Sequence, residues 1–473
     1  MSTKLRIVLC LKQIKTSPRI RADGSQASAA VTFNPDDETA LESALTLRDQ
    51  HAVHITALTM GPPSAETVLR EALARGCDDA VLITSSVLAG SDTLATARTL
   101  ADAVRTLSPD LIICGRRASD GDTGQVPPML AGILGVPFIP DLLKFDLSDS
   151  PPAVVTFARA EPLRRPSIMG LRRARSTAVR IIAPDAGYPS PTRVVRSTVL
   201  AREVRRPRIL TPADALTLLM KPVGADETPE VQPAQICEEA VCMVVDAPIP
   251  LAFTLGYPVE PVSLPAMPVR ESALFLAERI RRDAPAVVLA PATSRCRAVL
   301  PYTAALLGCG MTADCTGLRM EQGELVQIRP AFGGDVLAEI VTSTRPVVAT
   351  VRVPDAARKV LTGGAGLGSR GMFERLIRIA DRLGMECCAT RAAVDLGYAD
   401  YARQLGQSGR IVTPALYAGI GVSGAPQHLA GIHGGTRLCV NIDRTAPILD
   451  VSDYAVLMRA EDVLAEWEEL LGL

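Results

Sequence analysis

The segment Lys359-Val-Leu-Thr-Gly-Gly-Ala-Gly-Leu-Gly-Ser-Arg-Gly371 begins as an apolar, strand-like run and continues as a glycine-rich loop. A helix-like stretch, Phe373–Leu383, follows. The loop contains a G-x-G-x-x-G pattern from Gly366 to Gly371, whose backbone N–H groups can approach a pyrophosphate at the positive end of a helix. A strand, such a loop and a helix together predict the start of a parallel-sheet nucleotide-binding unit.

The glycine pattern alone is compatible with two interpretations. One is an NAD-dependent dehydrogenase, with Glu386 following fifteen residues after Gly371. The other is an ordinary tight turn before a helix, which uses the same glycines. The chain has no evident catalytic histidine or Tyr-x-x-x-Lys motif, and this disfavours the dehydrogenase. The rest of the unit is predicted to contain two glycine- and hydroxyl-rich crossings and two strands, at Leu405–Gly409, Val422–Gly431, Ile411–Val412 and Leu438–Ile442.

The first 145 residues alternate between strand-like and helix-like segments. Such alternation predicts an α/β fold with a parallel sheet covered by helices on both faces, and ligands then bind at the carboxyl ends of the strands. The predicted elements are strands at Leu5–Leu11, His54–Thr59, Ala80–Ile83 and Leu111–Cys114, and helices at Glu38–Asp49, Ala65–Ala74, Thr93–Leu107 and Val126–Leu134.

An irregular, Pro- and Arg-rich region follows, and Lys221–Glu238 has the composition of a linker. The α/β pattern resumes at Val241. We therefore expect a first domain at 1–205, a linker at 206–240, a second domain at 241–355 and a third at 356–473.

The composition is that of a globular protein, because 48% of the 473 residues are hydrophobic and 21% are charged. A net charge of −1 and only 3% aromatic residues argue against binding to nucleic acid. No apolar run approaches the ~18 residues of a membrane span, and no export signal is evident. Eleven cysteines without a Cys-x-x-Cys pair favour reduced thiols in the cytoplasm and disfavour a metal site.

Residues 359–457 resemble the flavin-binding domain of the alpha subunit in the electron-transfer flavoprotein family. The resemblance rests on the order and spacing of five blocks: Thr390-Arg-Ala-Ala-Val-Asp395, Gln404-Leu-Gly-Gln-Ser-Gly-Arg410, Ser423-Gly-Ala-Pro-Gln-His-Leu-Ala-Gly431, Asn441-Ile-Asp443 and Ser452-Asp-Tyr454. Two earlier blocks, Thr312–Leu318 and Arg329–Gly334, are similar to the first domain of the same subunit.

The N-terminal half resembles the beta subunit, through Asn34-Pro-Asp-Asp-Glu38, Met60-Gly-Pro62, Glu71-Ala-Leu-Ala-Arg-Gly76 and Asp120-Gly-Asp-Thr-Gly-Gln125. The order of the blocks implies a natural fusion of beta and alpha subunits. It also implies adenine nucleotide alpha hydrolase-like first and middle domains and a Rossmann-like, FAD-binding third domain.

For the third domain, the resemblance implies one FAD. Arg391 would stabilise negative charge on the reduced flavin, Ser408 would hydrogen-bond near flavin N5, and His428 would donate to the pyrimidine carbonyl. The other residues implied to contact the cofactor are Thr390, Leu405, Gly406, Gln407, Ser423, Gly424, Ala425, Pro426, Gln427, Asn441, Asp453 and Tyr454, with Asn441 and Asp453 at the ribose and adenosine end.

The residues themselves leave simpler roles open. Arg391 has Asp395 one helical turn further on and can be its ion-pair partner. His428 can be a histidine at a helix start that makes one backbone hydrogen bond. Asp453 can cap a turn or helix, and Ser408 can cap a helix while also touching the flavin.

For the first domain, the resemblance implies AMP or a second FAD, held by Asn34, Met60 and the loop Asp120, Gly121, Asp122, Thr123, Gly124, Gln125 and Val126. Physically, this loop leads into a helix start whose positive end favours an anion. Solvated acidic turns are the alternative. The blocks Asp120–Pro128, Ser91–Thr96 and Ser190–Val195 are most similar to the electron-bifurcating group of the family, which carries two FAD molecules.

Several positions depart from the family pattern. The family's Gly-Gly-Arg-Gly loop contains Ala365 here, with Arg370 as the nearest replacement, and Asp36 stands where an aromatic residue is usual. Both halves are also shorter than their counterparts: the first around Leu147–Pro151, and the second before Val241.

The resemblance implies an electron carrier without catalytic residues of its own. It would accept electrons from a flavin dehydrogenase of the acyl-CoA dehydrogenase type and pass them to a quinone reductase or a ferredoxin-type acceptor. A redox-inactive nucleotide-binding protein is the main alternative, and the NAD-dependent dehydrogenase is the weaker one. The sequence does not specify the oligomeric state.

Overall fold

The computed structural model describes residues 5–15, 31–142, 153–157, 179–199, 207–221, 241–246, 249, 252, 255, 257–331, 336–353, 355–406, 409–410, 412–429 and 431–473. These residues divide into two units. The first contains the described residues up to 199 together with 241–352, and the second contains 207–221 together with 353–473.

The N-terminal half of the first unit is built on a seven-stranded sheet in the order β7-β8-β6-β1-β4-β5-β9, and every pair is parallel. This confirms the predicted α/β fold. The strands are β1 (Leu5–Cys10), β4 (Val53–Met60), β5 (Asp79–Ile83), β6 (Leu111–Cys114), β7 (Phe138–Leu142), β8 (Ala153–Phe157) and β9 (Arg180–Ile182), and β2 (Gln13–Lys15) pairs with β3 (Val31–Phe33) as a small antiparallel hairpin.

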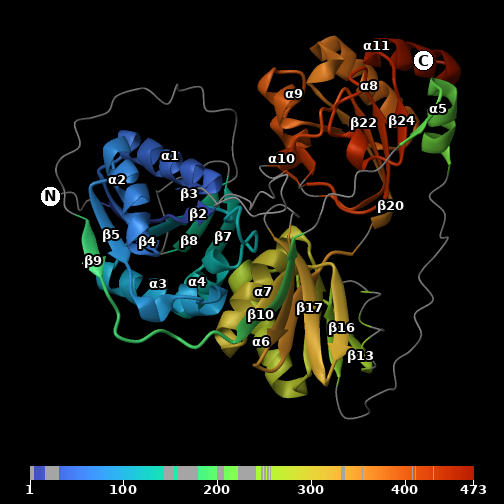
Figure 1. Cartoon of the computed structure of the whole chain (residues 1–473). Helices are drawn as coiled ribbons and strands as arrows, with labels where there is room; N and C mark the ends of the chain where they lie inside the picture. The colour runs from blue at the N-terminus through green and yellow to red at the C-terminus, as the bar shows by residue number, and fades with distance from the viewer. Residues whose placement is uncertain are drawn as a thin grey trace, which may run out of the picture. The chain divides into compact units, whose positions relative to one another are not determined.

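Helices cover both faces of this sheet (Figure 1). Successive residues of β1 point to opposite faces, so Ile7 joins the core that contains Leu41 and Leu69, whereas Val8 joins the core that contains Leu94 and Leu130. The helices are α1 (Pro35–Gln50) and α2 (Glu66–Arg75) on the first face and α3 (Thr93–Leu107) and α4 (Val126–Leu134) on the second, with short 3-10 turns η1 (Pro63–Ala65) and η2 (Ser86–Leu88).

The second half of this unit contains a five-stranded parallel sheet in the order β13-β12-β14-β19-β15 and a four-stranded antiparallel sheet in the order β10-β18-β17-β16. The first-half strand β10 therefore pairs with β18 of the second half. The elements are β10 (Thr192–Val199), β12 (Cys242–Val245), β13 (Val259–Val262), β14 (Val287–Pro291), β15 (Met311–Cys315), β16 (Gly317–Glu321), β17 (Glu324–Ala331), β18 (Val336–Thr342), β19 (Val347–Val351), α6 (Val269–Asp283) and α7 (Ser294–Leu307).

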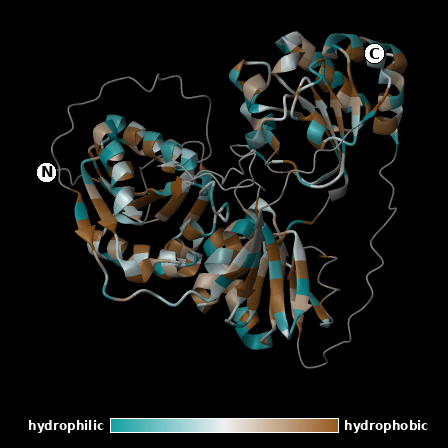
Figure 2. Ribbon diagram, in the orientation of Figure 1, coloured by the Kyte–Doolittle hydropathy of each residue, from teal (hydrophilic) through white to brown (hydrophobic). Residues whose placement is uncertain are grey.

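Helices α4 and α7 pack together and join the two halves in one apolar core. Gly132 of α4 lies directly against Tyr302 of α7, because a Cβ at position 132 would stand 2.9 Å from the Tyr302 carbonyl oxygen. The buried Tyr302 hydroxyl also donates to the carbonyl of Val136 at 3.0 Å. Figure 2 shows the same partition in hydropathy, with apolar residues on the strands and polar residues on outward helix faces.

The second unit contains a six-stranded parallel sheet in the order β11-β24-β23-β22-β20-β21. Its strands are β11 (Arg208–Ile209), β20 (Asp355–Gly363), β21 (Glu386–Ala389), β22 (Pro414–Ile420), β23 (Thr436–Val440) and β24 (Tyr454–Val456). Its helices are α5 (Pro212–Met220), α8 (Arg370–Arg382), α9 (Arg391–Asp395), α10 (Pro426–Leu429) and α11 (Ala460–Leu471), with 3-10 turns η5 (Ala365–Leu367), η6 (Tyr401–Arg403) and η7 (Leu449–Val451).

Two sequence-based expectations differ from this fold. The stretch assigned to a linker contains β11 and α5, and α5 is fixed by the indole N–H of the buried Trp467, which donates to the Pro212 carbonyl at 2.8 Å. A strand was expected at Ile411–Val412, but Val412 forms only an isolated bridge and the strand is β22. Ile411 lies outside the described residues. Over the described part of the chain, every helix is too short or too polar to cross a membrane.

We expect Gly132→Val to destabilise the first unit, because its side chain would meet the backbone of α7. Overpacking of this kind costs about 1–3 kcal/mol. Scanning calorimetry should show a lower melting temperature for that unit. Gly371→Val is the control, since the nearest atom to an added Cβ there is Ser369 Oγ at 3.9 Å. Equal melting temperatures for Gly132→Val and wild type would contradict the close α4–α7 contact.

Candidate functional site

In the second unit the strand order reverses direction between β20 and β22. In open parallel sheets, ligands bind in the crevice outside the carboxyl ends of the strands at such a reversal point. The loops after these two strands touch through their backbones: Gly364 N–H donates to Ile420 O at 2.9 Å, and Gly366 N–H donates to Gly421 O at 3.0 Å. A Cβ on Gly364 or Gly366 would collide with Gly421. These glycines therefore permit close contact between the two loops.

Glu386 does not occupy the position of a ribose-binding acid. It begins β21 opposite Val360, at the amino edge of the sheet, whereas the glycine loop follows the carboxyl end of β20. Its carboxylate accepts from Arg358 Nε at 2.7 Å and also pairs with Arg410. This placement removes the main support for the NAD-dependent dehydrogenase.

Thr390 and Arg391 follow β21 at the carboxyl edge. Thr390 caps α9, since its hydroxyl accepts from Ala393 N at 3.3 Å. Arg391 is exposed (53% of its side chain) and lies 3.3 Å from the Asp395 carboxylate. Such exposed pairs are weak, so the guanidinium is free to exchange Asp395 for another anion.

His428 lies in a buried pair with Tyr417 of β22. Its Nε2 is 2.9 Å from the Tyr417 hydroxyl, and its Nδ1 is 3.3 Å from the carbonyl oxygen of Leu405. Burial lowers the pKa of His428 to about 4, so the imidazole is neutral at pH 7. Burial also raises the pKa of Tyr417, which stays a phenol.

The loop that contains Ser423, Gly424 and Ala425 is held by Asn441. The Asn441 amide donates to the Val422 carbonyl at 2.8 Å, and Ile448 N–H donates to the Ser423 carbonyl at 3.1 Å. Gly424 has φ +85° and packs against the Ile448 backbone, so a side chain there would clash. Asn441 thus shapes this edge from within the protein.

Most of the residues expected to contact FAD lie at the carboxyl edge of the second-unit sheet, and two of them lie elsewhere. At the carboxyl edge are Thr390, Arg391, Leu405, Gly406, Ser423, Gly424, Ala425, Pro426, Gln427, His428 and Asn441. Asp453 and Tyr454 lie instead at the start of β24, where the Asp453 carboxylate accepts from Arg437 N at 2.9 Å. Gln407 and Ser408 lie outside the described residues.

The first unit has an equivalent reversal point between β1 and β6, and a ligand crevice is expected there for the same reason. Asp120, in the loop after β6, spans it by accepting from Lys12 Nζ at 2.7 Å, and also accepts from Gly121 N–H at 2.7 Å. Asn34 holds the same loop, because its buried amide donates to the Arg117 carbonyl and the Asp37 carboxylate, both at 2.9 Å. Burial raises the pKa of Asp37 to about 8.

Gln125 connects this loop to the neighbouring sheet. It accepts from the Thr93 hydroxyl at 2.8 Å and donates to the Met311 carbonyl at 3.2 Å. Met60 ends β4 and Val126 begins α4, so both also lie at this edge. Residues Asn34, Met60 and Asp120–Val126 therefore lie at the same edge of the sheet.

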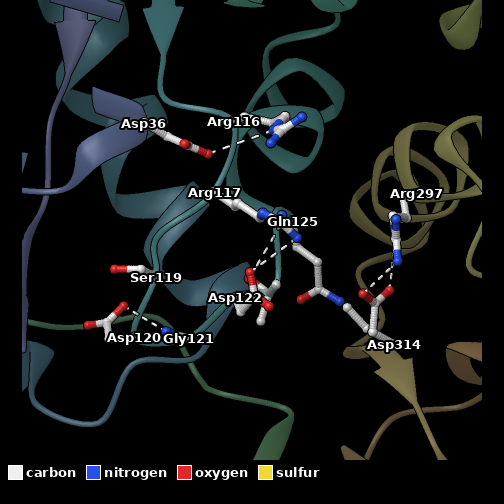
Figure 3. A network of polar contacts seen from close by, with 12 residues as sticks. Asp36, Arg116, Arg117, Ser119, Asp120, Gly121, Asp122, Gln125, Arg297 and Asp314 are labelled. Carbon is white, nitrogen blue, oxygen red and sulfur yellow. Dashed lines mark hydrogen bonds and ion pairs between the residues drawn. The ribbon is translucent and has the colours of Figure 1, made fainter. Parts of the chain in front are cut away.

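An arginine cluster from the second half of the unit lies beside the same loop. Arg329 and Arg352 are buried, whereas Arg297 keeps 31% of its side chain exposed. Figure 3 shows Arg297 paired with Asp314 next to this loop. Arg297 donates two hydrogen bonds to the Asp314 carboxylate, from Nε at 2.9 Å and from Nη2 at 2.8 Å. Arg352 Nη2 lies 3.6 Å from the same carboxylate. Arg329 donates to the Gly121 carbonyl at 2.7 Å. The family-like blocks Thr312–Leu318 and Arg329–Gly334 contain Asp314 and Arg329, but neither contains Arg297 or Arg352, and no sequence pattern assigns these charges to the first-domain site.

The cluster has unused hydrogen-bond donors. Among the described residues, Arg352 Nε and Nη1 and Arg329 Nη2 are buried and have no hydrogen-bond partner. Burial lowers the pKa of the Arg352 guanidinium, although an arginine stays charged at neutral pH. Buried cations without enough counter-charge are costly, so the site fits an anionic ligand such as a phosphate or an anionic ring.

Asp36, the departure from the family motif, is partly buried beside Arg116, whose Nε lies 3.7 Å from its carboxylate. Burial raises the pKa of Asp36. Asp36 therefore adds a carboxyl group close to the candidate site of the first unit.

No metal-binding group is formed: the described side chains contain no cluster of three or more His, Cys, Asp or Glu residues suited to a metal. The ten described cysteines are free thiols, and all except Cys10 are buried.

Parallel sheets with two loop-lined crevices define a nucleotide-binding α/β protein. Sequence comparison makes the class more specific: the Electron transfer flavoprotein domain matches residues 26–162 and 259–366, and the Electron transfer flavoprotein FAD-binding domain matches residues 355–433. The chain belongs to the electron transfer flavoprotein family. The same domain family matches both halves of the first unit, and a FAD-binding domain follows.

Relatives of both subunits are similar to this chain. The electron transfer flavoprotein subunit beta of Clostridium acetobutylicum is 46% identical over 138 residues, which cover 28% of this chain and 53% of the relative. The alpha subunit of the same organism is 33% identical over 244 residues, covering 41% and 73%. The acryloyl-CoA reductase electron transfer subunit gamma of Anaerotignum propionicum is 47% identical over 141 residues, covering 28% and 53%.

These matches are consistent with a fusion of beta-like and alpha-like parts. The chain nevertheless spans only about half the length of the first beta-type relatives that it matches.

Neutral, buried His428 makes the stability of the second unit depend on pH. Its folded pKa of about 4 lies below the unfolded value of 6.5, so stability is complete above pH 6.5 and is lost as the pH falls towards 4. The expected loss is about 3 kcal/mol.

In His428→Gln, that part of the pH dependence should disappear. Urea unfolding can be followed by the fluorescence of Trp467, the single tryptophan. His51→Gln, at an exposed histidine, should keep the wild-type pH dependence. Identical pH profiles for His428→Gln and wild type would rule out this assignment.

Proposed function

We propose that this protein is an electron carrier that binds FAD in its second unit and a second nucleotide in its first. The observation that carries the proposal is the presence, in one chain, of two reversal-point crevices with different linings. One has glycine loops, hydroxyls and a neutral imidazole, and the other has buried arginines. FAD supplies reversible electron transfer, and the protein groups bind it, orient it and set the charge around it.

The residues at the second-unit crevice fit a flavin nucleotide. Gly364, Gly366 and Gly424 let backbones approach closely at this edge, where α9 and α10 also begin. Arg391 is an exposed cation at this edge, and we propose that it moves from Asp395 to the flavin when the cofactor binds.

For the first unit we favour a second FAD over AMP. The arginine cluster beside Gly121 supports an anionic ligand, and the choice of FAD rests on the similarity to the bifurcating group. Asp36 opposes binding of a phosphate directly beside it. Electron bifurcation requires both flavins, so it depends on this site.

We propose a flavin dehydrogenase of the acyl-CoA dehydrogenase type as the electron donor. The similarity to a subunit named for electron transfer to acryloyl-CoA reductase supports a flavin enzyme as partner. A quinone reductase or a ferredoxin-type protein is the proposed acceptor. The carrier would act in the cytoplasm.

One observation favours a second candidate, a redox-inactive nucleotide-binding protein. Ala365 replaces the arginine of the family loop, and Arg370 is exposed (72% of its side chain) and pairs with Glu374 at 3.3 Å. The loop thus carries no buried cation of its own.

Nucleotide content distinguishes these functions. We expect the purified chain, reconstituted with FAD, to release two FAD per chain on denaturation, as counted by chromatography. One FAD and one AMP would indicate a simple carrier. AMP without flavin would support the redox-inactive protein, and failure to bind micromolar FAD would exclude an electron carrier.

Arg391→Ala should make the flavin of the second unit harder to reduce, because a cation near developing negative charge is lost. For an exposed arginine the effect is about 1 kcal/mol in the free energy of reduction. A spectroscopic redox titration measures it. Arg378→Ala is the control. It removes an exposed arginine of α8 that pairs with Glu468 of α11, and it should leave the potential unchanged. An unchanged or raised potential in Arg391→Ala, with FAD still bound, would contradict the role given to Arg391.

A further inference from the structure

Asp314 is the carboxylate around which the arginine cluster of the first unit is arranged. Its side chain is buried (4% exposed) and accepts two hydrogen bonds from Arg297, while Arg352 lies 3.6 Å away. Burial alone would raise the pKa of Asp314, but Arg297 and Arg352 outweigh it and hold that pKa below its usual value. Asp314 is therefore ionised and shared between two cations.

The backbone at Asp314 departs from regular strand geometry, and this sets the direction of its side chain. Asp314 has φ +58°, an uncommon value for a residue other than glycine, and the pairing of β15 with β19 shifts register between Thr312 and Cys315. The Asp314 N–H is satisfied by the Thr350 hydroxyl at 2.9 Å. Irregularities of this kind redirect side chains near functional sites and persist because the surroundings hold them.

Asp314 does not balance the charge of its surroundings. It faces Arg297 and Arg352, with Arg329 beside them, so three cations share one carboxylate at this point of the described structure. The second carboxylate nearby, Asp122, lies 3.2 Å from Arg117 and is engaged there. The buried N–H groups of Arg352 and Arg329 that have no partner remain available to a ligand.

We propose that Asp314 is a built-in counter-ion that competes with the anionic group of the first-unit ligand for Arg297 and Arg352. This inference rests on the proposed nucleotide site. Without ligand, Asp314 keeps the arginines together and lowers their mutual repulsion. When a ligand binds, the same carboxylate weakens binding for two reasons. It repels the anionic group of the ligand, and it already pairs with N–H groups of Arg297 and Arg352 that the ligand would use.

The proposal predicts opposite effects for two substitutions. Asp314→Asn keeps the side-chain shape and removes one negative charge, so it should tighten AMP binding about tenfold, the effect of one unit charge at roughly 7 Å in a partly screened site. Arg297→Gln removes one positive charge and should weaken AMP binding by a similar factor. Adenosine, which has no charge, should bind each variant within about twofold of wild type.

The experiment is isothermal titration of the full chain, stripped of nucleotide, with AMP and with adenosine at low and high salt. Asp283→Asn is the matched control: it removes an equal charge at the end of α6, at the opposite edge of the sheet, from a carboxylate paired with Arg279 and Arg282. Its AMP affinity should equal that of wild type. The difference between Asp314→Asn and wild type should shrink at high salt.

The possible outcomes separate this inference from the nucleotide site itself. If wild type binds AMP and Asp314→Asn binds it equally or more weakly, the counter-ion role is wrong while the site stands. An equal change in AMP and adenosine binding would indicate a merely structural role and would also overturn it. If Asp314→Asn does not fold, Arg297→Gln decides, and unchanged AMP affinity in that variant refutes the proposal.

If wild type binds neither AMP nor adenosine, the first unit has no AMP site. Inorganic phosphate then tests the counter-ion alone: a larger rise in melting temperature for Asp314→Asn than for wild type supports it, and an equal rise refutes it.

Discussion

Parallel pairing of β1 with β6, in which Cys10 faces Cys114, sets the loops after these two strands side by side at one edge of the sheet. The loop after β1 supplies Lys12 and the loop after β6 supplies Asp120, and the two side chains meet across the reversal point. Pairing of β20 with β22 does the same in the second unit, where Gly364 meets Gly421. In both cases the register of the strands decides which polar groups can act together.

The polar groups at the two candidate sites differ in charge. In the second unit the buried groups are neutral: His428 and Tyr417 bond to each other, and the only cation that we assign to the site, Arg391, is exposed. In the first unit the side chains of Arg329 and Arg352 are buried, and the charge of the arginine cluster is compensated only in part by Asp314. A neutral lining is compatible with many ligands, whereas a buried excess of cations is stable only with an anion nearby. The charge of the first site therefore restricts its ligands to anions.

Local patterns predicted the elements that local sequence controls. The strand–helix alternation predicted the parallel sheets, and the glycine loops predicted the two edges. The arginine cluster was not predicted, because Arg297 comes from α7, Asp314 from β15 and Arg352 from the residue after β19, and they meet only when β15 and β19 pair. Strand β11 has two residues and so carries no pattern of its own; it is defined by pairing with β24, more than two hundred residues away. Glu386 matched a motif in spacing, but the register of β21 places it at the opposite edge.

The hydrogen bonds of His428 also restrict which chemistry the second site can perform. The Leu405 carbonyl can only accept, so Nδ1 carries the ring proton and Nε2 accepts from Tyr417. With its pKa lowered by burial, the ring gains no second proton at neutral pH. Donation from His428 to a flavin carbonyl therefore requires either that Nδ1–H leaves the Leu405 carbonyl, or that Nε2 leaves Tyr417 and the ring changes tautomer. Because Tyr417 lies within β22, the strand that shapes the crevice also fixes the position of this proton.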